Sequence, residues 1–196
     1  MTKTEQIIQA ADSAYLSIYR RFPVVFDHGE RVYLYDVEGK KYLDFGAGIA
    51  VMGLGYGHKR YNDVLKTQID KLIHTSNLFY HEPGAIAAQK LRDASGLQHV
   101  FFTNSGTEAV EGALKLAKKH ANQAGKHNYE IIAMKHSFHG RSLGALSVTG
   151  NDHYQEPFRP LIQNIKFADY NDLKSVEALV SDNTAAVIME TIQGEG

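Results

Sequence analysis

The sequence of 196 residues contains no cysteine, which excludes a disulfide framework and any metal site built on thiolates. Its formal net charge is only −1, so neither nucleic acid nor an anionic membrane is expected as the main partner. No apolar run approaches the length of a membrane span, and the N-terminus lacks the basic and then apolar layout of a signal peptide. We therefore expect a cytoplasmic globular protein with a hydrophobic core of its own.

The stretch from residue 101 to residue 119 organises the rest of the chain. Residues 99–103 form a short apolar run that is typical of a strand buried on both faces. A turn of small and polar residues follows, and from Glu108 onward apolar residues recur at helical spacing. Glu111 and Lys115 are expected to pair on the solvent side of this helix, because they lie one turn apart.

The turn before this helix has the properties of an anion site. Ser105 and Glu108 fit a capping box, which leaves the first free N–H groups of the helix at Gly106 and Thr107. These groups and the positive end of the helix dipole point the same way, and Ser105 and Thr107 add hydroxyl donors. A phosphate is the ligand that such a turn suits best. The competing interpretation is an ordinary strand-to-helix turn with a good cap.

Alternating strands and helices after residue 99 predict an α/β fold with a mainly parallel sheet and flanking helices. An antiparallel β-meander is expected before them, over residues 24–45. The remaining expected helices are 4–19, 59–74, 84–94, 142–150 and 173–181, and the remaining expected strands are 129–134, 164–167 and 185–189. Residues 151–160 are expected to form an irregular loop.

Two further segments suggest a ligand. Residues 45–57 are rich in glycine but contain no nucleotide-binding loop motif, so they predict tight turns and close backbone approach. Residues 135–141 form a loop at the carboxyl end of an expected strand, which is the edge where open α/β sheets bind ligands. His136 and His139 in this loop have the spacing of a metal pair. We do not favour a metal site, because no third ligand has suitable spacing.

The SGTEAxExAxKxA pattern that begins at Ser105 resembles the phosphate-binding turn of class III aminotransferases of the ornithine and acetylornithine type, which use pyridoxal phosphate (PLP). The similarity extends from Tyr19 to Gly196 and includes several separate motifs. It implies the type I fold of PLP-dependent transferases, with residues 1–58 as an N-terminal helix and meander and residues 59–196 as part of the PLP-binding large domain. It also implies that Ser105, Gly106 and Thr107 bind the cofactor phosphate.

Other motifs of the resemblance assign roles to single residues. In SFHGR, Phe138 is implied to stack on the pyridine ring and Arg141 to bind a substrate carboxylate, roles that suit a flat aromatic face and a guanidinium fork. His139 and Glu190 are implied to lie at the cofactor. Phe138 could instead be plain core.

Three more residues are implied to contact the substrate. Tyr19 occupies the place of a substrate-contacting tyrosine, with a surface aromatic as the alternative. Glu195 is implied to pair with a distal arginine that this chain lacks. Ile49 is aliphatic where ornithine enzymes have an aromatic residue, and this leaves room for an N-acyl group.

The chain departs from the family pattern in places. Tyr56, Gly57 and Lys59 stand where the family usually has histidine, a variable residue and proline, and Thr191 replaces the usual proline of EPxQGEG. The HTSNLFY segment at residues 74–80 matches, and the resemblance places it near the active site across the interface of a homodimer.

The resemblance implies transfer of an amino group from N-acetylornithine to 2-oxoglutarate, in arginine biosynthesis. Ornithine and succinylornithine are the alternative amino donors. The lysine that holds PLP as a Schiff base and the aspartate that faces the pyridine nitrogen are expected beyond residue 196, so no catalytic residue is assigned. We therefore expect roughly the first half of a longer enzyme, inactive by itself. A non-catalytic domain that binds phosphate ligands, and an inactive truncated product, stay open as alternatives.

Overall fold

The computed structural model describes residues 1–196, which divide into two compact units, Met1–Ala85 and Ile86–Gly196. The boundary falls inside helix α4 (Glu82–Ser95). Each unit is described by itself. The division expected from the sequence, at residues 58 and 59, concerns the domains of the aminotransferase fold and stays a prediction.

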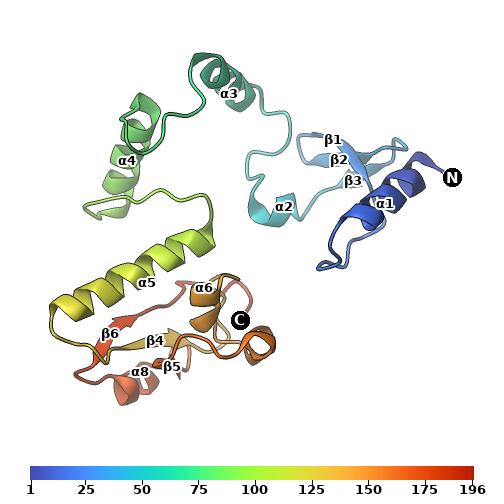
Figure 1. The fold of residues 1–196 in the computed structure, drawn as a ribbon. Coiled ribbons are helices and arrows are strands. Elements are labelled where there is room, and N and C mark those ends of the chain that lie inside the picture. Colours follow the sequence, from blue (N-terminus) through green and yellow to red (C-terminus); the bar gives the residue numbers. More distant parts are fainter. The chain divides into compact units, whose positions relative to one another are not determined.

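The first unit begins with helix α1 (Lys3–Ala14) and an antiparallel sheet in the order β1-β2-β3 (Figure 1). The strands are β1 (Phe26–Glu30), β2 (Tyr33–Asp36) and β3 (Lys41–Leu43), so the predicted meander is confirmed. Asp36 fixes the β2–β3 turn, because its carboxylate accepts hydrogen bonds from the Lys40 N–H at 2.8 Å and the Glu38 N–H at 3.0 Å.

Helix α1 is shorter than the sequence pattern predicted. It ends at Ala14 and not at residue 19. Ile18, which continues the helical spacing of the predicted apolar face, is 66% exposed. Since helices gain most of their stability by packing an apolar face, the pattern alone did not extend the helix into this exposed segment.

The glycine-rich stretch forms the tight turns and the close backbone approach that were predicted, and the approach is to the β1–β2 turn. A Cβ on Gly55, whose φ is +71°, would lie 2.4 Å from the carbonyl oxygen of Arg31. The short helix α2 (Ala47–Ala50) lies in the same stretch, and helix α3 (Lys59–Lys71) follows it. Helices α3 and α4 confirm the two helices predicted here, with boundaries that differ by up to three residues.

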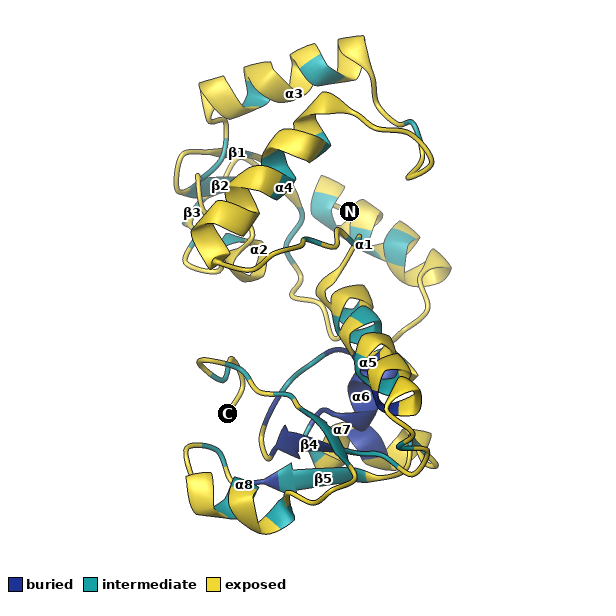
Figure 2. Ribbon diagram, turned by 90° about the vertical axis from the view of Figure 1, so that its left-hand side faces the viewer, coloured by how far each residue is buried: buried dark blue, intermediate teal, exposed yellow.

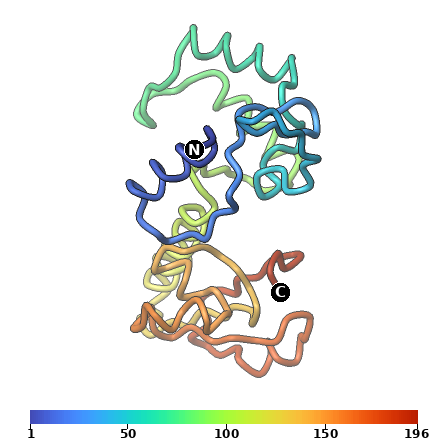
Figure 3. Tube along the Cα trace, turned by 90° about the vertical axis from the view of Figure 1, so that its right-hand side faces the viewer, coloured from blue at the N-terminus to red at the C-terminus, as the bar shows by residue number.

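The second unit contains a parallel sheet in the order β5-β4-β6. Its strands are β4 (Glu130–Met134), β5 (Ile165–Ala168) and β6 (Thr184–Val187). Figure 3 follows the trace of this unit from α5 (Gly106–Gln123) to the red C-terminal end. Helices α6 (Leu143–Ser147), α7 (Asp152–Gln155) and α8 (Leu173–Leu179) and the short 3-10 helix Glu156–Phe158 complete it. The predicted α/β class with a parallel sheet is confirmed.

The core lies around β4, where the fully buried residues of Figure 2 gather. Successive β4 residues face opposite sides of the sheet. Ile131 and Ala133 pack with Leu114 of α5 and with Val148, whereas Ile132 and Met134 pack with Ala168 and residues of α8. The sheet therefore has a helix layer on each face, and its central strand points its carboxyl end toward the loop at residues 135–141.

Three local predictions were wrong. Residues 99–103 form no strand, because no other strand of the chain pairs with them, and Phe101 and Phe102 are 69% and 51% exposed. Residues 151–160 are not irregular, since α7 and the 3-10 helix occupy most of them. Glu111 does not pair with Lys115, and its carboxylate instead accepts hydrogen bonds from the start of α6.

Candidate functional site

The N-terminus of α5 is a capped helix start with two free donors. The Ser105 hydroxyl accepts a hydrogen bond from the Glu108 N–H at 3.3 Å. The Glu108 carboxylate accepts from the N–H of Asn104 at 2.7 Å and not from that of Ser105, so only half of the predicted capping box forms. The N–H groups of Gly106 and Thr107 have no protein acceptor. A Cβ added to Gly106 would meet no atom within 4 Å, so space is open beside these donors.

The loop after β4 reaches this helix start. Gly140 has a φ of +135°, and a Cβ at this position would lie 2.4 Å from Thr107 Oγ1 and 2.8 Å from Thr107 Cβ. Two residues further on, Ser142 Oγ lies 2.8 Å from Thr107 Oγ1. Two motifs that are more than thirty residues apart in the sequence are thus in direct contact, and glycine is what permits the approach.

Glu111 joins the same cluster, which sequence reasoning missed. Its Oε1 accepts hydrogen bonds from Ser142 Oγ at 2.5 Å and from the Ala145 N–H at 3.1 Å. The available signal was its spacing from Thr107, because residues four apart on a helix lie on one face. The equal spacing between Glu111 and Lys115 predicted an ion pair on the solvent side, whereas in the structure the Glu111 side chain points toward α6.

Phe138 and Arg141 lie side by side in the loop after β4. The Arg141 guanidinium carbon lies 5.6 Å from the centroid of the Phe138 ring, and the Tyr154 ring meets Phe138 edge to face at 6.2 Å. Arg141 is exposed and forms no ion pair with a carboxylate. The rings border a hollow of about 230 Å³. Its lining residues are Phe138, Gly140, Arg141, Leu146, His153, Tyr154 and Phe158.

The segment after β6 packs against this loop through its two glutamates. Glu190 accepts hydrogen bonds from the N–H of Phe138 and the N–H of Gly194, each at 3.3 Å. The Tyr154 hydroxyl donates to Glu195 at 2.9 Å, and this bond raises the pKa of Tyr154 above its usual range. The structure therefore brings Glu190 and Glu195 to the loop that contains Phe138 and Arg141.

His139 is held by its backbone while its ring is partly buried. The His139 N–H donates to Thr149 Oγ1 at 3.0 Å. Burial lowers the pKa of its imidazole below the ordinary value, with a smaller opposite effect of the Glu190 charge. Ring atom Nε2 is buried and has no hydrogen-bond partner. A buried polar atom without a hydrogen-bond partner is costly, so Nε2 is available to form a hydrogen bond with a polar group that enters the site. No group of three or more metal-ligating side chains accompanies it.

Lys135 is the lysine at this edge of the sheet. It follows β4 directly, and its ammonium lies 2.7 Å from the carboxylate of Asp169, which follows β5. The hydrogen bond from Lys135 lowers the pKa of Asp169. Lys135 is therefore engaged in an ion pair between the ends of two neighbouring strands.

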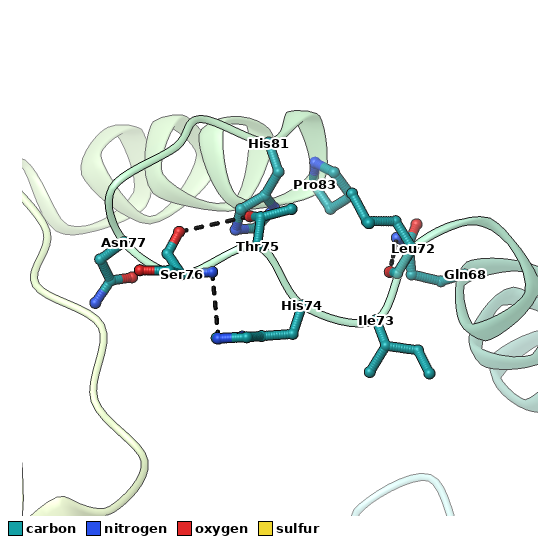
Figure 4. A pocket seen from close by; sticks show the side chains of 9 residues that line it. All are labelled: Gln68, Leu72, Ile73, His74, Thr75, Ser76, Asn77, His81 and Pro83. Carbon is teal, nitrogen blue, oxygen red and sulfur yellow. Dashed lines mark hydrogen bonds between the residues drawn. The ribbon is translucent and has the colours of Figure 1, made fainter.

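Two predicted substrate residues belong to the first unit. Tyr19 is 56% exposed, and Ile49 is 95% exposed with a φ of +60°. The HTSNLFY segment of the same unit borders a hollow of about 170 Å³ between α3 and α4, shown in Figure 4. There the His74 ring accepts a hydrogen bond from the Ser76 N–H at 3.2 Å. That these residues share a site with those of the second unit stays a prediction.

None of the helices is both long and apolar enough to cross a membrane.

Comparison with known proteins identifies the family. The family described as aminotransferase class-III matches residues 15–196. The mitochondrial acetylornithine aminotransferase of Debaryomyces hansenii is 47% identical over 92% of this chain and 41% of its own length. The succinylornithine transaminase of Salmonella paratyphi A is 45% identical over 94% of this chain and 46% of its own length. The chain thus spans less than half the length of these relatives.

A solved structure shows the same fold. The ornithine aminotransferase of Toxoplasma gondii, crystallised with oxidised glutathione and with PLP at partial occupancy in its active site, matches with a TM-score of 0.90. The match has 28% sequence identity and covers 98% of this chain and 46% of that one. The predicted fold of PLP-dependent transferases is confirmed, and PLP is the cofactor that the match implies. The chain belongs to the class III aminotransferases.

Proposed function

We propose that this protein is a PLP-dependent aminotransferase that transfers the δ-amino group of N-acetylornithine to 2-oxoglutarate, in arginine biosynthesis. Family membership supports an aminotransferase that acts on amino acids and 2-oxo acids. The relative from Debaryomyces, named as an acetylornithine aminotransferase, supports the choice of amino donor. The activity is proposed for the whole protein, since the chain covers less than half of each relative.

The residues present fit the phosphate of PLP. The free N–H groups of Gly106 and Thr107 and the positive end of the α5 dipole suit a dianion. The open space at Gly106 lets such an anion approach the backbone. Ser105 and Thr107 supply hydroxyl groups at the same turn. The orphaned Nε2 of His139 offers a further polar contact in the adjoining loop.

The adjoining loop supplies the groups for the ring and the substrate. PLP supplies an electron sink when bound, and the protein contributes binding, orientation and electrostatics. The flat face of Phe138 can support a planar ring. The exposed guanidinium of Arg141, which has no carboxylate partner, can bind the α-carboxylate of the substrate bidentately. Glu190 holds the backbone of Phe138 in place through its N–H.

One observation carries this proposal. The contact of Gly140 and Ser142 with Thr107 sets the phosphate turn directly against the loop that contains Phe138 and Arg141. The residues that we propose for the phosphate, the cofactor ring and the substrate carboxylate therefore all belong to the unit Ile86–Gly196. An isolated phosphate-binding turn would require neither the aromatic face of Phe138 nor the exposed guanidinium of Arg141.

The decisive test of the cofactor site is Thr107→Val in the full-length protein. Valine keeps the shape and removes a hydroxyl that donates to a dianion, which should weaken PLP binding by about 1.5–3 kcal/mol. PLP affinity is measured by absorbance titration. Thr67→Val is the matched control, because Thr67 is exposed on α3. An unchanged PLP dissociation constant in Thr107→Val would reject the phosphate assignment.

The amino donor is tested by comparing kcat/KM for acetylornithine, succinylornithine and ornithine. The aliphatic side chain of Ile49 supports an N-acyl substrate, and the Salmonella relative makes succinylornithine the main alternative. A preference for free ornithine would contradict the proposal.

We also propose that residues 1–196 alone do not transaminate, because none of the residues assigned to the site is a lysine that could hold PLP. Turnover by that segment with added PLP would refute this.

The assembly that we propose is a homodimer. Its support is the exposed apolar end of the HTSNLFY segment, where Leu78 and Phe79 are 85% and 68% exposed and Tyr80 is fully exposed. Light scattering of the full-length protein measures its oligomeric state directly.

The compartment that we propose is the cytoplasm. The Debaryomyces relative is named as mitochondrial, so microscopy of the tagged protein decides between the two locations.

A further inference from the structure

All four residues of the short helix α2 have positive φ values. They are +45° at Ala47, +61° at Gly48, +60° at Ile49 and +61° at Ala50. Such a left-handed turn suits glycine but is unfavourable for residues with a Cβ, and three of these four have one. A strained turn persists only where the surrounding structure holds it, and such turns cluster at functional sites. The contacts that hold α2 therefore need an explanation.

Asp44 holds the start of this turn through both oxygens of its carboxylate. Oδ1 accepts hydrogen bonds from the N–H groups of Gly46 and Ala47, each at 2.9 Å. Oδ2 accepts from the Tyr56 hydroxyl at 2.7 Å, and this bond is the main cause that lowers the pKa of Asp44. The ionised carboxylate thus joins the two ends of the segment that contains α2.

Tyr56 is in turn fixed to the meander. Its N–H donates to the Arg31 carbonyl oxygen at 2.7 Å, and the Arg31 N–H donates to the Tyr56 carbonyl oxygen at 2.9 Å. A Cβ on Gly29 of β1 would overlap the Tyr56 ring, so the ring lies directly against that strand. Asp44 directly follows β3. Both residues that hold the turn are therefore anchored on the three-stranded sheet.

The Ile49 side chain, by contrast, is 95% exposed. Since so little packing holds it, its direction depends on the backbone of the turn. An Ile49 residue that left the left-handed conformation would point its side chain elsewhere. The proposed function requires this side chain to leave room for the N-acyl group of the amino donor, so the turn has to keep its shape.

We propose that Asp44 and Tyr56 are positioning residues that hold the left-handed turn and thereby keep the Ile49 side chain out of the space for the acyl group. This inference deepens the proposed function and rests on it. Both residues act through Ile49 and not by contact with the substrate. The arrangement favours the acylated donor over ornithine, because ornithine has no acyl group for a displaced side chain to obstruct.

A purely structural role of the contact between Asp44 and Tyr56 is the competing explanation. Its loss would lower the amount of active enzyme and so reduce the rate for every amino donor equally. Loss of the Ile49 position affects donors with an acyl group. The ratio of kcat/KM for acetylornithine to kcat/KM for ornithine separates the two roles, because it does not depend on the fraction of active enzyme.

The experiment measures this ratio and the thermal unfolding midpoint for variants of the full-length protein loaded with PLP. Asp44→Ala removes every contact of the carboxylate and should lower the ratio about tenfold, which is the effect of a methylene-sized mismatch in a pocket. Tyr56→Phe keeps the ring and removes only the hydroxyl, so it should lower the ratio about threefold. Asp44→Asn should keep the ratio within about twofold, because its amide can accept from the same N–H groups and donate to the Tyr56 hydroxyl oxygen.

The β2–β3 turn supplies a matched control. There the Tyr42 hydroxyl donates to Asp36 Oδ2 at 2.8 Å, and Asp36 Oδ1 accepts from two backbone N–H groups, as Asp44 Oδ1 does. Tyr42→Phe and Asp36→Ala therefore remove the same kinds of contact from the same sheet and leave those of α2 in place. They should lower the unfolding midpoint without changing the ratio.

A second background completes the test. In Ile49→Ala, the further change Asp44→Ala should not alter the ratio, because the side chain through which it acts is gone. If Asp44→Ala fails to fold, Tyr56→Phe decides alone. Equal losses for both donors, a changed ratio in Tyr42→Phe, or a loss in Asp44→Asn as large as in Asp44→Ala would overturn the positioning role and leave the proposed function intact. A wild-type enzyme that prefers ornithine would reject the proposed amino donor, and the inference with it.

Discussion

Replacing Gly140 with alanine tests the contact between the two halves of the site. The added Cβ would lie 2.4 Å from Thr107 Oγ1, 2.8 Å from Thr107 Cβ and 3.0 Å from Ala145 Cβ. The φ of +135° is also a conformation that residues other than glycine rarely adopt. Backbone strain of about 1–3 kcal/mol and overpacking of about 1–3 kcal/mol predict a loss of about 2–6 kcal/mol in the free energy of unfolding.

The assay is denaturant unfolding of the full-length protein, with PLP affinity measured in parallel. Gly125→Ala is the matched control, because Gly125 has a φ of +76° and a Cβ there would meet no atom within 4 Å. It should lose only about 1 kcal/mol, which is the backbone term alone. Adding Thr107→Ala to Gly140→Ala should recover part of the stability, since it removes the closest atom. Equal losses for Gly140→Ala and Gly125→Ala would refute the close approach.

Three further predictions concern single residues. Arg141→Lys should reduce turnover far more than PLP content, because lysine cannot reproduce a bidentate grip on a carboxylate; normal kinetics per bound PLP would make Arg141 structural. Ile49→Tyr should narrow the preference for acetylornithine over ornithine in kcat/KM, and an unchanged ratio would remove Ile49 from the substrate site. Because burial lowers the pKa of His139 from the ordinary 6.5, the folded state resists its protonation, and stability present above about pH 6.5 is lost as the pH falls through the folded pKa. His139→Gln should therefore lose less stability than the wild type between about pH 7 and pH 5, and parallel unfolding curves would contradict this.

The local features of the site could be predicted because they depend on neighbours in the sequence. The cap at Ser105 and the free donors at Gly106 and Thr107 follow from helix geometry, which leaves the first N–H groups without partners in any helix. The alternation of strands and helices after residue 99 predicted a parallel sheet for a similar reason, since periodicity reports which face of an element is buried. The loop at residues 135–141 was placed at the ligand-binding edge by this order alone.

Contacts between distant segments were decided only by the tertiary structure. Glu111 lies one helical turn from both Thr107 and Lys115. Nothing in the sequence indicates that its carboxylate accepts hydrogen bonds from the start of α6 instead of pairing with Lys115. The apolar run at residues 99–103 has the composition of a strand, but a strand exists only where a second strand supplies its hydrogen bonds. The sequence does not distinguish Gly140 from the other 16 of its 17 glycines, and only the structure shows that it lies against Thr107. Sequence by itself determined the helix start and its free donors, because they depend on adjacent residues. The tertiary structure alone decided which side chains meet beside that helix start, because that depends on how β4 and α6 pack against α5.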